Sequence, residues 1–157
     1  MKGEQTPLVA ILTCSDSRID PARIFGLSNG QAFVVRNAGN SVSDQGALGS
    51  LEYAVAKLRV KALLVMGHTS CGAVAASYEI DQNPNLSALM RDLECAKCKL
   101  GPDASRDRDK VSEANVRFQM RRMLDTSTII RTAVQGGETE LIGAIYQLSS
   151  GKVKFIE

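Results

Sequence analysis

The chain is poor in aromatic residues and in histidine. Its 157 residues include no tryptophan, and aromatic residues make up 4% of the sequence. It has one histidine, His68. A metal site in this chain therefore has a single imidazole to use, and no second histidine is present to relay protons.

Long apolar runs and an excess of charge of one sign are also missing. No stretch approaches the roughly 20 apolar residues that span a bilayer, and the start, MKGEQTP, lacks the apolar core of a signal peptide. The formal net charge is +2, and the charged residues are scattered. Neither nucleic acid nor an anionic membrane is indicated as a partner, and we expect a soluble, cytoplasmic protein.

A chain of this length fits a single domain, which we expect to cover residues 1–157. Such a domain can bury a core without help from a metal or from disulfides. Its four cysteines are better interpreted as thiols or metal ligands, because a reducing compartment disfavours disulfides.

Short apolar runs alternate with helical patterns. Strands are predicted over residues 8–13, 32–36, 62–67, 140–147 and 153–156. Helices are predicted over 43–58, 72–78, 86–93, 110–124 and 126–134, with a surface loop over 99–108. The alternation predicts an α/β fold, with a mostly parallel central sheet flanked by helices and a C-terminal antiparallel hairpin strand.

Two of the predicted strands end at soft metal ligands. Cys14 directly follows the first strand, His68 directly follows the third, and Cys71 comes three residues later. Each residue taken alone is more often a buried structural side chain, but sites in parallel sheets form at the carboxyl ends of strands, where these two segments can meet. Two thiolates and one imidazole bind zinc strongly and leave the fourth tetrahedral position to water. The sequence therefore predicts one catalytic Zn²⁺ per chain.

Two charged residues follow Cys14 in the run Cys14-Ser15-Asp16-Ser17-Arg18. Asp16 can accept a hydrogen bond from a hydroxide nucleophile, and Arg18 can pair with that carboxylate and keep it ionised. A thiol phosphatase loop would instead place arginine six residues after the cysteine, where this chain has Asp20. A metal-free cysteine nucleophile is therefore disfavoured.

Cys95 and Cys98 form a second pair, separated by two residues. No further cysteine or histidine is left to complete a metal site with them. A redox pair stays open, but two thiols near a helix end are the favoured interpretation.

Four motifs together resemble the β-class carbonic anhydrases: CSDSR at 14–18, RNAGN at 36–40, SLEYAV at 50–55 and GHTSCGAV at 67–74. The resemblance implies zinc bound by Cys14, His68 and Cys71, and reversible hydration of carbon dioxide to bicarbonate and a proton. It also implies that Asp16 and Arg18 form the catalytic dyad.

The same resemblance implies a substrate pocket that is shared between subunits of a homodimer or a higher homo-oligomer. Gln5 matches a glutamine that hydrogen-bonds bicarbonate, and Gly72 matches a backbone donor near the substrate. Phe33 and Tyr53 match apolar walls of the pocket. Ala38 stands where some members have valine, so we expect a slightly wider pocket.

The chain departs from the family pattern in two places. The helical arm that usually precedes the first strand is short or missing, and Ile11 stands where an inhibitory bicarbonate site requires tryptophan. We therefore predict an open site, in which Asp16 pairs with Arg18. The alternative enzyme is a carbonyl sulfide or carbon disulfide hydrolase on the same fold. A non-catalytic zinc-binding module is the alternative from another class.

Overall fold

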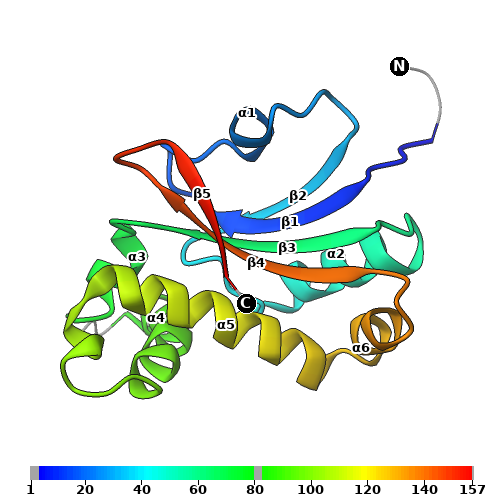
Figure 1. Cartoon of the computed structure of the whole chain (residues 1–157). Coiled ribbons are helices and arrows are strands. Elements are labelled where there is room, and N and C mark those ends of the chain that lie inside the picture. Colours follow the sequence, from blue (N-terminus) through cyan, green and yellow to red (C-terminus); the bar gives the residue numbers. More distant parts are fainter. Residues whose placement is uncertain (1–3, 80–82, 157) are drawn as a thin grey trace.

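A five-stranded sheet forms the centre of the molecule. The computed structural model describes residues 4–79 and 83–156. The strands are β1 (Val9–Cys14), β2 (Ala32–Asn37), β3 (Ala62–His68), β4 (Glu140–Gln147) and β5 (Lys152–Ile156), in the spatial order β2-β1-β3-β4-β5. Four strands run parallel, and β5 pairs antiparallel with β4. The predicted fold class, including the C-terminal hairpin, is confirmed (Figure 1).

Helices cover the two faces of this sheet unequally. They are α1 (Pro21–Phe25), α2 (Gln45–Ala56), α3 (Gly72–Ala76), α4 (Pro84–Cys98), α5 (Arg108–Thr126) and α6 (Thr128–Gln135), with a short 3₁₀ turn, η1 (Ala104–Arg106). The α2, α5 and α6 helices lie against one face, and α1 lies on the other (Figure 1). Within the described residues, no helix has the length and apolar character needed to cross a membrane.

Alternate residues of the strands enter two different cores, as the two-residue repeat of a strand requires. Leu12 of β1 packs in the core that contains Leu51 of α2 and Val116 of α5. Its neighbour Ile11 packs on the opposite face, together with Ile19. Both faces of the sheet are covered, so side chains on both sides of a central strand are buried. This is why the sequences of these strands are continuous apolar runs.

The helix α1 was not predicted from the sequence. It has five residues, which are too few to show a helical repeat. Its only signal in the sequence is the set of residues at its two ends, which are typical helix caps. The Asp20 side chain accepts a hydrogen bond from the Arg23 N–H, Pro21 occupies the first turn, and Gly26 ends the helix at φ +63°. Glycine suits that left-handed position because it has no Cβ.

Several other helices begin or end at different residues from those predicted, because a capping side chain sets the boundary. The predicted 86–93 helix is longer, because Asn83 caps the N-terminus of α4 and Pro84 starts the helix instead of breaking it. Of the predicted break at 81–85, residues 81 and 82 lie outside the described residues. Asp107 caps α5 inside the predicted loop, and Ser127 both ends α5 and caps α6.

Gly67 lies where β3 packs closely against α5. A Cβ at this position would lie 2.9 Å from Val116 Cγ2 and 3.0 Å from Ile145 Cδ1, well inside the optimal carbon–carbon separation of about 3.5–4.0 Å. We expect Gly67→Ala to lower the free energy of unfolding by about 1–3 kcal/mol, as measured by urea denaturation. Gly49→Ala on α2 is the matched control, since a Cβ there meets nothing within 4 Å. Equal stability of Gly67→Ala and wild type would contradict this packing.

A buried carboxylate connects α4 with α5 and with the segment after β2. Asp92, 4% exposed, accepts hydrogen bonds from Ser41 Oγ at 2.5 Å, from Ser43 Oγ, and from Gln119 Nε2 at 3.1 Å. Arg122 Nη1 lies 2.7 Å from its Oδ1. Burial alone would raise the pKa of Asp92, but the hydroxyl, amide and guanidinium donors outweigh it and hold this pKa below its ordinary value.

This lowered pKa predicts a pH-dependent contribution of Asp92 to stability. The contribution is complete above the ordinary carboxyl pKa near 4 and is lost as the pH falls through the lower folded-state pKa. We expect Asp92→Asn to cost about 1–3 kcal/mol at neutral pH, with a smaller difference from wild type in strong acid. Urea denaturation at about pH 7 and about pH 3 measures both values. Asp125→Asn, in an exposed ion pair with Arg121, should cost little at either pH, and a pH-independent cost for Asp92→Asn would refute the linkage.

Candidate active site

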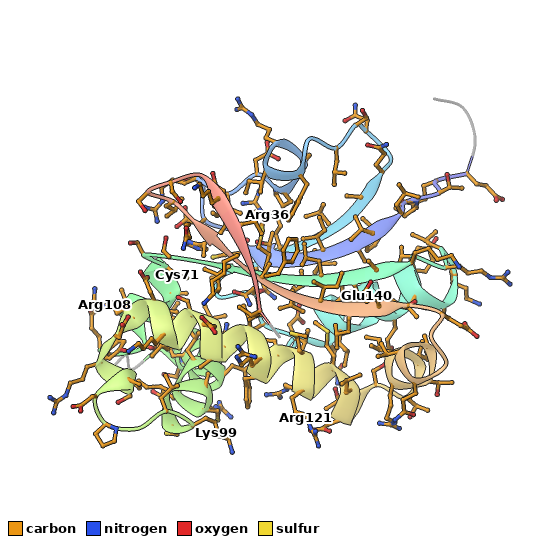
Figure 2. All side chains as sticks on the ribbon, in the orientation of Figure 1. Arg36, Cys71, Lys99, Arg108, Arg121 and Glu140 are labelled. Carbon is orange, nitrogen blue, oxygen red and sulfur yellow. The ribbon has the colours of Figure 1, made fainter. Side chains whose placement is uncertain are left out.

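The three predicted metal ligands meet at the carboxyl edge of the sheet. Cys14 is the last residue of β1 and His68 the last residue of β3, and these strands are parallel neighbours. Cys71 follows after a short turn and occupies the N-cap position of α3. In Figure 2, Cys71 lies toward this end of the sheet, and Glu140, at the start of β4, lies toward the other.

The geometry of these side chains fits a soft metal ion. Their ligand atoms all lie within 4.8 Å of one another, and all three residues are buried. Bonds of about 2.0–2.3 Å to a tetrahedral zinc place ligand atoms about 3–4 Å apart, so a small contraction would close the site. The described residues contain no other group of this kind.

The imidazole of His68 is oriented for metal binding. Its Nδ1 lies 2.9 Å from the carbonyl oxygen of Thr69, so Nδ1 carries the proton and donates it. The other nitrogen, Nε2, is buried and has no hydrogen-bond partner. An unpaired buried nitrogen is costly, and binding of a metal ion by its lone pair removes that cost.

The two thiols are close enough to interact directly. Cys71 donates a hydrogen bond to Cys14, which lowers the pKa of Cys14 to about 4 against the effect of burial, with help from the nearby His68 imidazole and from the backbone N–H groups of Gly39 and Asp16. The same contact raises the pKa of Cys71 above its ordinary value. A metal ion would bind both side chains as thiolates and displace their protons. The sequence reasoning assigned no role to Gly39, whose φ of +74° is the reason that glycine is suited to this position.

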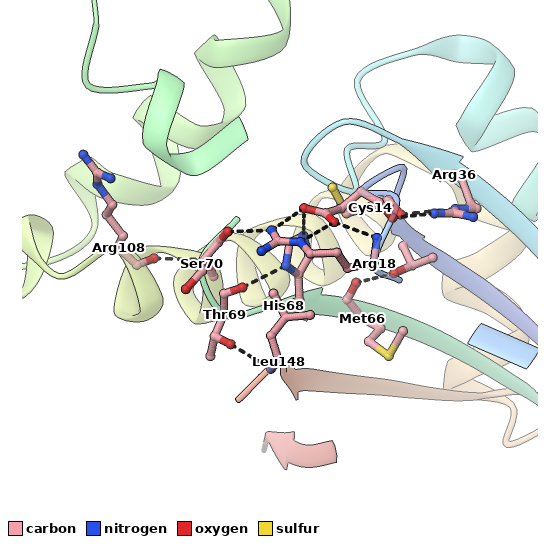
Figure 3. A network of polar contacts seen from close by, with 12 residues as sticks. Cys14, Arg18, Arg36, Met66, His68, Thr69, Ser70, Arg108 and Leu148 are labelled. Carbon is pink, nitrogen blue, oxygen red and sulfur yellow. Dashed lines mark hydrogen bonds and ion pairs between the residues drawn. The ribbon is translucent and has the colours of Figure 1, made fainter. Parts of the chain in front are cut away.

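Asp16 and Arg18 form the ion pair predicted from the sequence. Arg18 Nε lies 2.9 Å from Asp16 Oδ1, and Arg18 Nη2 lies 2.7 Å from Asp16 Oδ2. The hydrogen bonds from Arg18 hold the pKa of Asp16 far below its ordinary value. Asp16 Oδ2 also lies 3.8 Å from His68 Nε2, which places an ionised acceptor beside the three ligands. Figure 3 shows Arg18 and His68 side by side, with Ser70 next to them.

Arg36 holds the loop after β1 in place. Its Nε donates to the Cys14 carbonyl oxygen at 3.2 Å, and its Nη2 donates to the Asp16 carbonyl oxygen at 2.9 Å (Figure 3). Arg36 therefore orients the backbone that carries one metal ligand and the acidic residue. Arg36 begins the RNAGN motif, but nothing in the sequence around it predicts this role.

The residues predicted for the substrate pocket divide into two groups. Gly72 follows Cys71, and the half-buried Ala38 follows β2, so both lie at the edge that carries the ligands. Gln5 is exposed and precedes β1, and Phe33 pairs with Ala10 near the start of that strand.

Gln5, Phe33 and Tyr53 therefore lie away from the ligands of their own chain. The rings of Phe33 and Tyr53 are neighbours, with centroids 6.1 Å apart. The five steps from Val9 to Cys14 alone cover about 16 Å. The chain enters β1 at the end of the sheet opposite α3 (Figure 1).

Cys95 and Cys98 lie in the last turn of α4. Both are free and exposed. Their predicted place near a helix end is confirmed.

The fold and the site define an α/β protein with a buried three-ligand centre for a soft metal, next to an ionised carboxylate. The family model described as carbonic anhydrase matches residues 9–153. The chain belongs to the carbonic anhydrase family, in its β class. Its reaction is the reversible hydration of carbon dioxide to bicarbonate and a proton.

Similar proteins come from several groups of organisms. A carbonic anhydrase of Mycolicibacterium smegmatis is 35% identical over 160 residues, which cover 96% of this chain and 75% of that protein. One from Synechococcus elongatus is also 35% identical, over 95% of this chain and 60% of its own length. The solved structure of a Coccomyxa β-carbonic anhydrase with acetazolamide has a TM-score of 0.89 and 30% identity, and the match covers 98% of this chain and 73% of that one.

Proposed function

We propose that the reaction takes place at one Zn²⁺ per chain, held by Cys14, His68 and Cys71. The observation that carries this proposal is the buried, unpartnered Nε2 of His68 beside two buried cysteines. When bound, zinc supplies a Lewis acid that lowers the pKa of a water molecule and makes hydroxide available near neutral pH.

Asp16 and Arg18 would orient the nucleophile in this site. The Asp16 carboxylate is kept ionised by Arg18, so it can accept a hydrogen bond from hydroxide and direct a lone pair toward carbon dioxide. Ala38 and Gly72 would border the substrate, with the Gly72 N–H as a donor to bicarbonate. A Cβ on Gly72 would meet nothing within 4 Å, which leaves room beside Cys71.

A second copy of the chain would complete the pocket. Gln5, Phe33 and Tyr53 lie at the opposite end of β1 from their own ligands, so they would serve the site of a partner subunit. Leu8 and Tyr53 are 60% and 46% exposed, which leaves apolar surface for such a contact. A solved structure of a similar protein from Sordaria macrospora, with 26% identity and a TM-score of 0.88, is described as tetrameric.

A mixing experiment tests whether the pocket is shared. We expect Gln5→Ala and Asp16→Asn to lower activity in their own homo-oligomers. A mixed dimer contains one site with both native residues, supplied by different chains, so co-refolded or co-expressed variants should be more active than the two preparations summed. Gln5→Ala mixed with itself is the control. Activity equal to the sum would contradict the shared pocket.

Carbon dioxide is proposed as the preferred substrate over carbonyl sulfide and carbon disulfide. All three are linear electrophiles that the same hydroxide could attack. Stopped-flow hydration of carbon dioxide, measured beside carbonyl sulfide consumption on zinc-loaded protein, decides between them. A strong preference for the sulfur compound would overturn the proposal.

We propose one domain over residues 1–157, supported by the single sheet and by the family match over 9–153. A cytoplasmic location stays a prediction from the sequence.

A further inference from the structure

The short turn between His68 and Cys71 has an unfavourable backbone conformation. Ser70 adopts φ +54°, in the left-handed region that residues with a Cβ disfavour. Thr69 is held by β4 and the residues after it: its N–H donates to the Tyr146 carbonyl oxygen at 3.0 Å, and its Oγ1 accepts from the Leu148 N–H at 3.0 Å. Ser70 therefore needs a separate contact to keep its conformation.

That contact comes from the first turn of α5. Asp109 Oδ1 accepts a hydrogen bond from the Ser70 N–H at 2.8 Å, across a sequence separation of 39 residues. The N–H of Asp109 donates in turn to the capping side chain of Asp107 at 3.0 Å. The N-terminus of α5 is thus joined directly to the turn that carries Cys71.

The carbonyl oxygen of Ser70 connects this turn to the ion pair beside the ligands. Arg18 Nη2 donates to it at 3.2 Å, while the same guanidinium holds Asp16. Figure 3 shows Arg18, His68 and Ser70 together in this network. The backbone of Ser70 is therefore held at both of its polar groups. Asp109 accepts from its N–H, and Arg18 donates to its carbonyl oxygen.

We propose that Asp109 is a positioning residue of the active site. Its carboxylate fixes the backbone of Ser70, which keeps Cys71 in place beside His68 and keeps the Ser70 carbonyl directed at Arg18. The second effect rests on the proposed function of Asp16 and Arg18. Asp109 does not touch the substrate.

The turn is open to solvent, so the Ser70 N–H needs an acceptor that is fixed in place, such as the Asp109 carboxylate. Ser70, Cys71 and Asp109 line a hollow of about 420 Å³, and Ser70 and Asp109 are exposed. Water can satisfy the Ser70 N–H when Asp109 is removed, so the stability of the whole chain should change little. Water does not fix the direction of that N–H, however, so the turn should open more often and expose the bond between Cys71 and the metal.

Zinc release from the holoenzyme tests the proposal without relying on activity. The rate of zinc transfer to a chromogenic chelator is measured for wild type, Asp109→Ala and Asp109→Asn. We expect Asp109→Ala to release zinc about 10–100-fold faster and to lose a similar factor in kcat/KM. Asp109→Asn should stay close to wild type, because its amide oxygen can still accept the Ser70 hydrogen bond.

Asp107→Ala separates positioning from helix stability. Asp107 caps α5 by accepting from the N–H groups of Asp109 and Lys110, so its loss weakens the same helix end and leaves the Ser70 contact in place. We expect a lower melting temperature for this variant with zinc release unchanged. Zinc release as fast as in Asp109→Ala would show that Asp109 acts only through the helix, and would overturn the proposal.

Combining Asp109→Ala with Arg18→Ala tests the contact between the Ser70 carbonyl oxygen and Arg18. If Asp109 acts on the reaction through Ser70 and Arg18, Asp109→Ala should reduce kcat much less in that background than in wild type, while still accelerating zinc release. Additive losses in kcat would remove this role. Wild-type rates of zinc release and kcat in Asp109→Ala would refute the whole inference, whereas an inactive wild type that binds zinc would refute only the proposed function.

Discussion

Cys71→Ala is expected to abolish both zinc binding and carbon dioxide hydration. The change leaves only one thiolate and one imidazole of the three-residue cluster. Binding of structural zinc by complete ligand sets is worth about 10–16 kcal/mol, and much of that is lost with a thiolate. Zinc content should fall from about one ion per chain to near zero, and stopped-flow rates should fall to the uncatalysed background.

The matched control for Cys71→Ala is Cys95→Ala. Cys95 is exposed on α4 and is also a free thiol, so its loss should change neither zinc content nor activity. Circular dichroism should show that Cys71→Ala is still folded, because the two cores on the faces of the sheet are built from apolar contacts that include neither Cys71 nor the metal. Stoichiometric zinc in a folded Cys71→Ala protein would refute the ligand assignment.

Asp16→Asn is expected to retain zinc and to lose activity by about 100-fold or more. Asparagine has nearly the same shape but is neutral, so it cannot take part in the ion pair with Arg18 and is a weaker acceptor for hydroxide. Its NH₂ group can also occupy the acceptor position beside His68. The loss should appear in kcat, because the interaction is made with the reacting oxygen, and zinc analysis on the same sample should still give one ion per chain.

Asp20→Asn is the control for this substitution. Asp20 lies in the same connection after β1 but only caps α1, where it accepts from the Arg23 N–H at 3.3 Å. Asparagine is an equally good cap, so activity and stability should stay close to wild type. Full activity in Asp16→Asn would show that Asp16 does not orient the nucleophile, and loss of zinc would show that it supports the ligands instead.

Much of the site could be predicted because its signals are local in the sequence. Continuous apolar runs before Cys14 and before His68 mark buried strands, and ligands at strand ends collect at one edge of a parallel sheet. The charge pair of Asp16 and Arg18 needs only a two-residue separation. These features depend on periodicity and residue type, which the sequence carries directly.

Contacts between distant segments had no such signal. The Asp92 carboxylate meets Ser41 across 51 residues, and the sequence shows no more than an aspartate in a helical pattern. The backbone N–H of Gly39 helps to lower the pKa of Cys14. Almost every residue has a backbone N–H, so residue type does not reveal which one will act in this way. The helix α1 was missed because its end residues, and not a repeat, define it.

The sequence by itself determined which side chains are available for chemistry: two cysteines and one histidine at strand ends, an acidic residue with its arginine, and an alternation of elements that places them together. Only the tertiary structure decided which groups face one another. It left Nε2 of His68 without a partner, joined Asp109 to Ser70 and put Gln5 at the far end of β1 from Cys14. The physical reason is that residue type and periodicity act within a few residues, whereas the direction of a hydrogen bond depends on how separate elements pack.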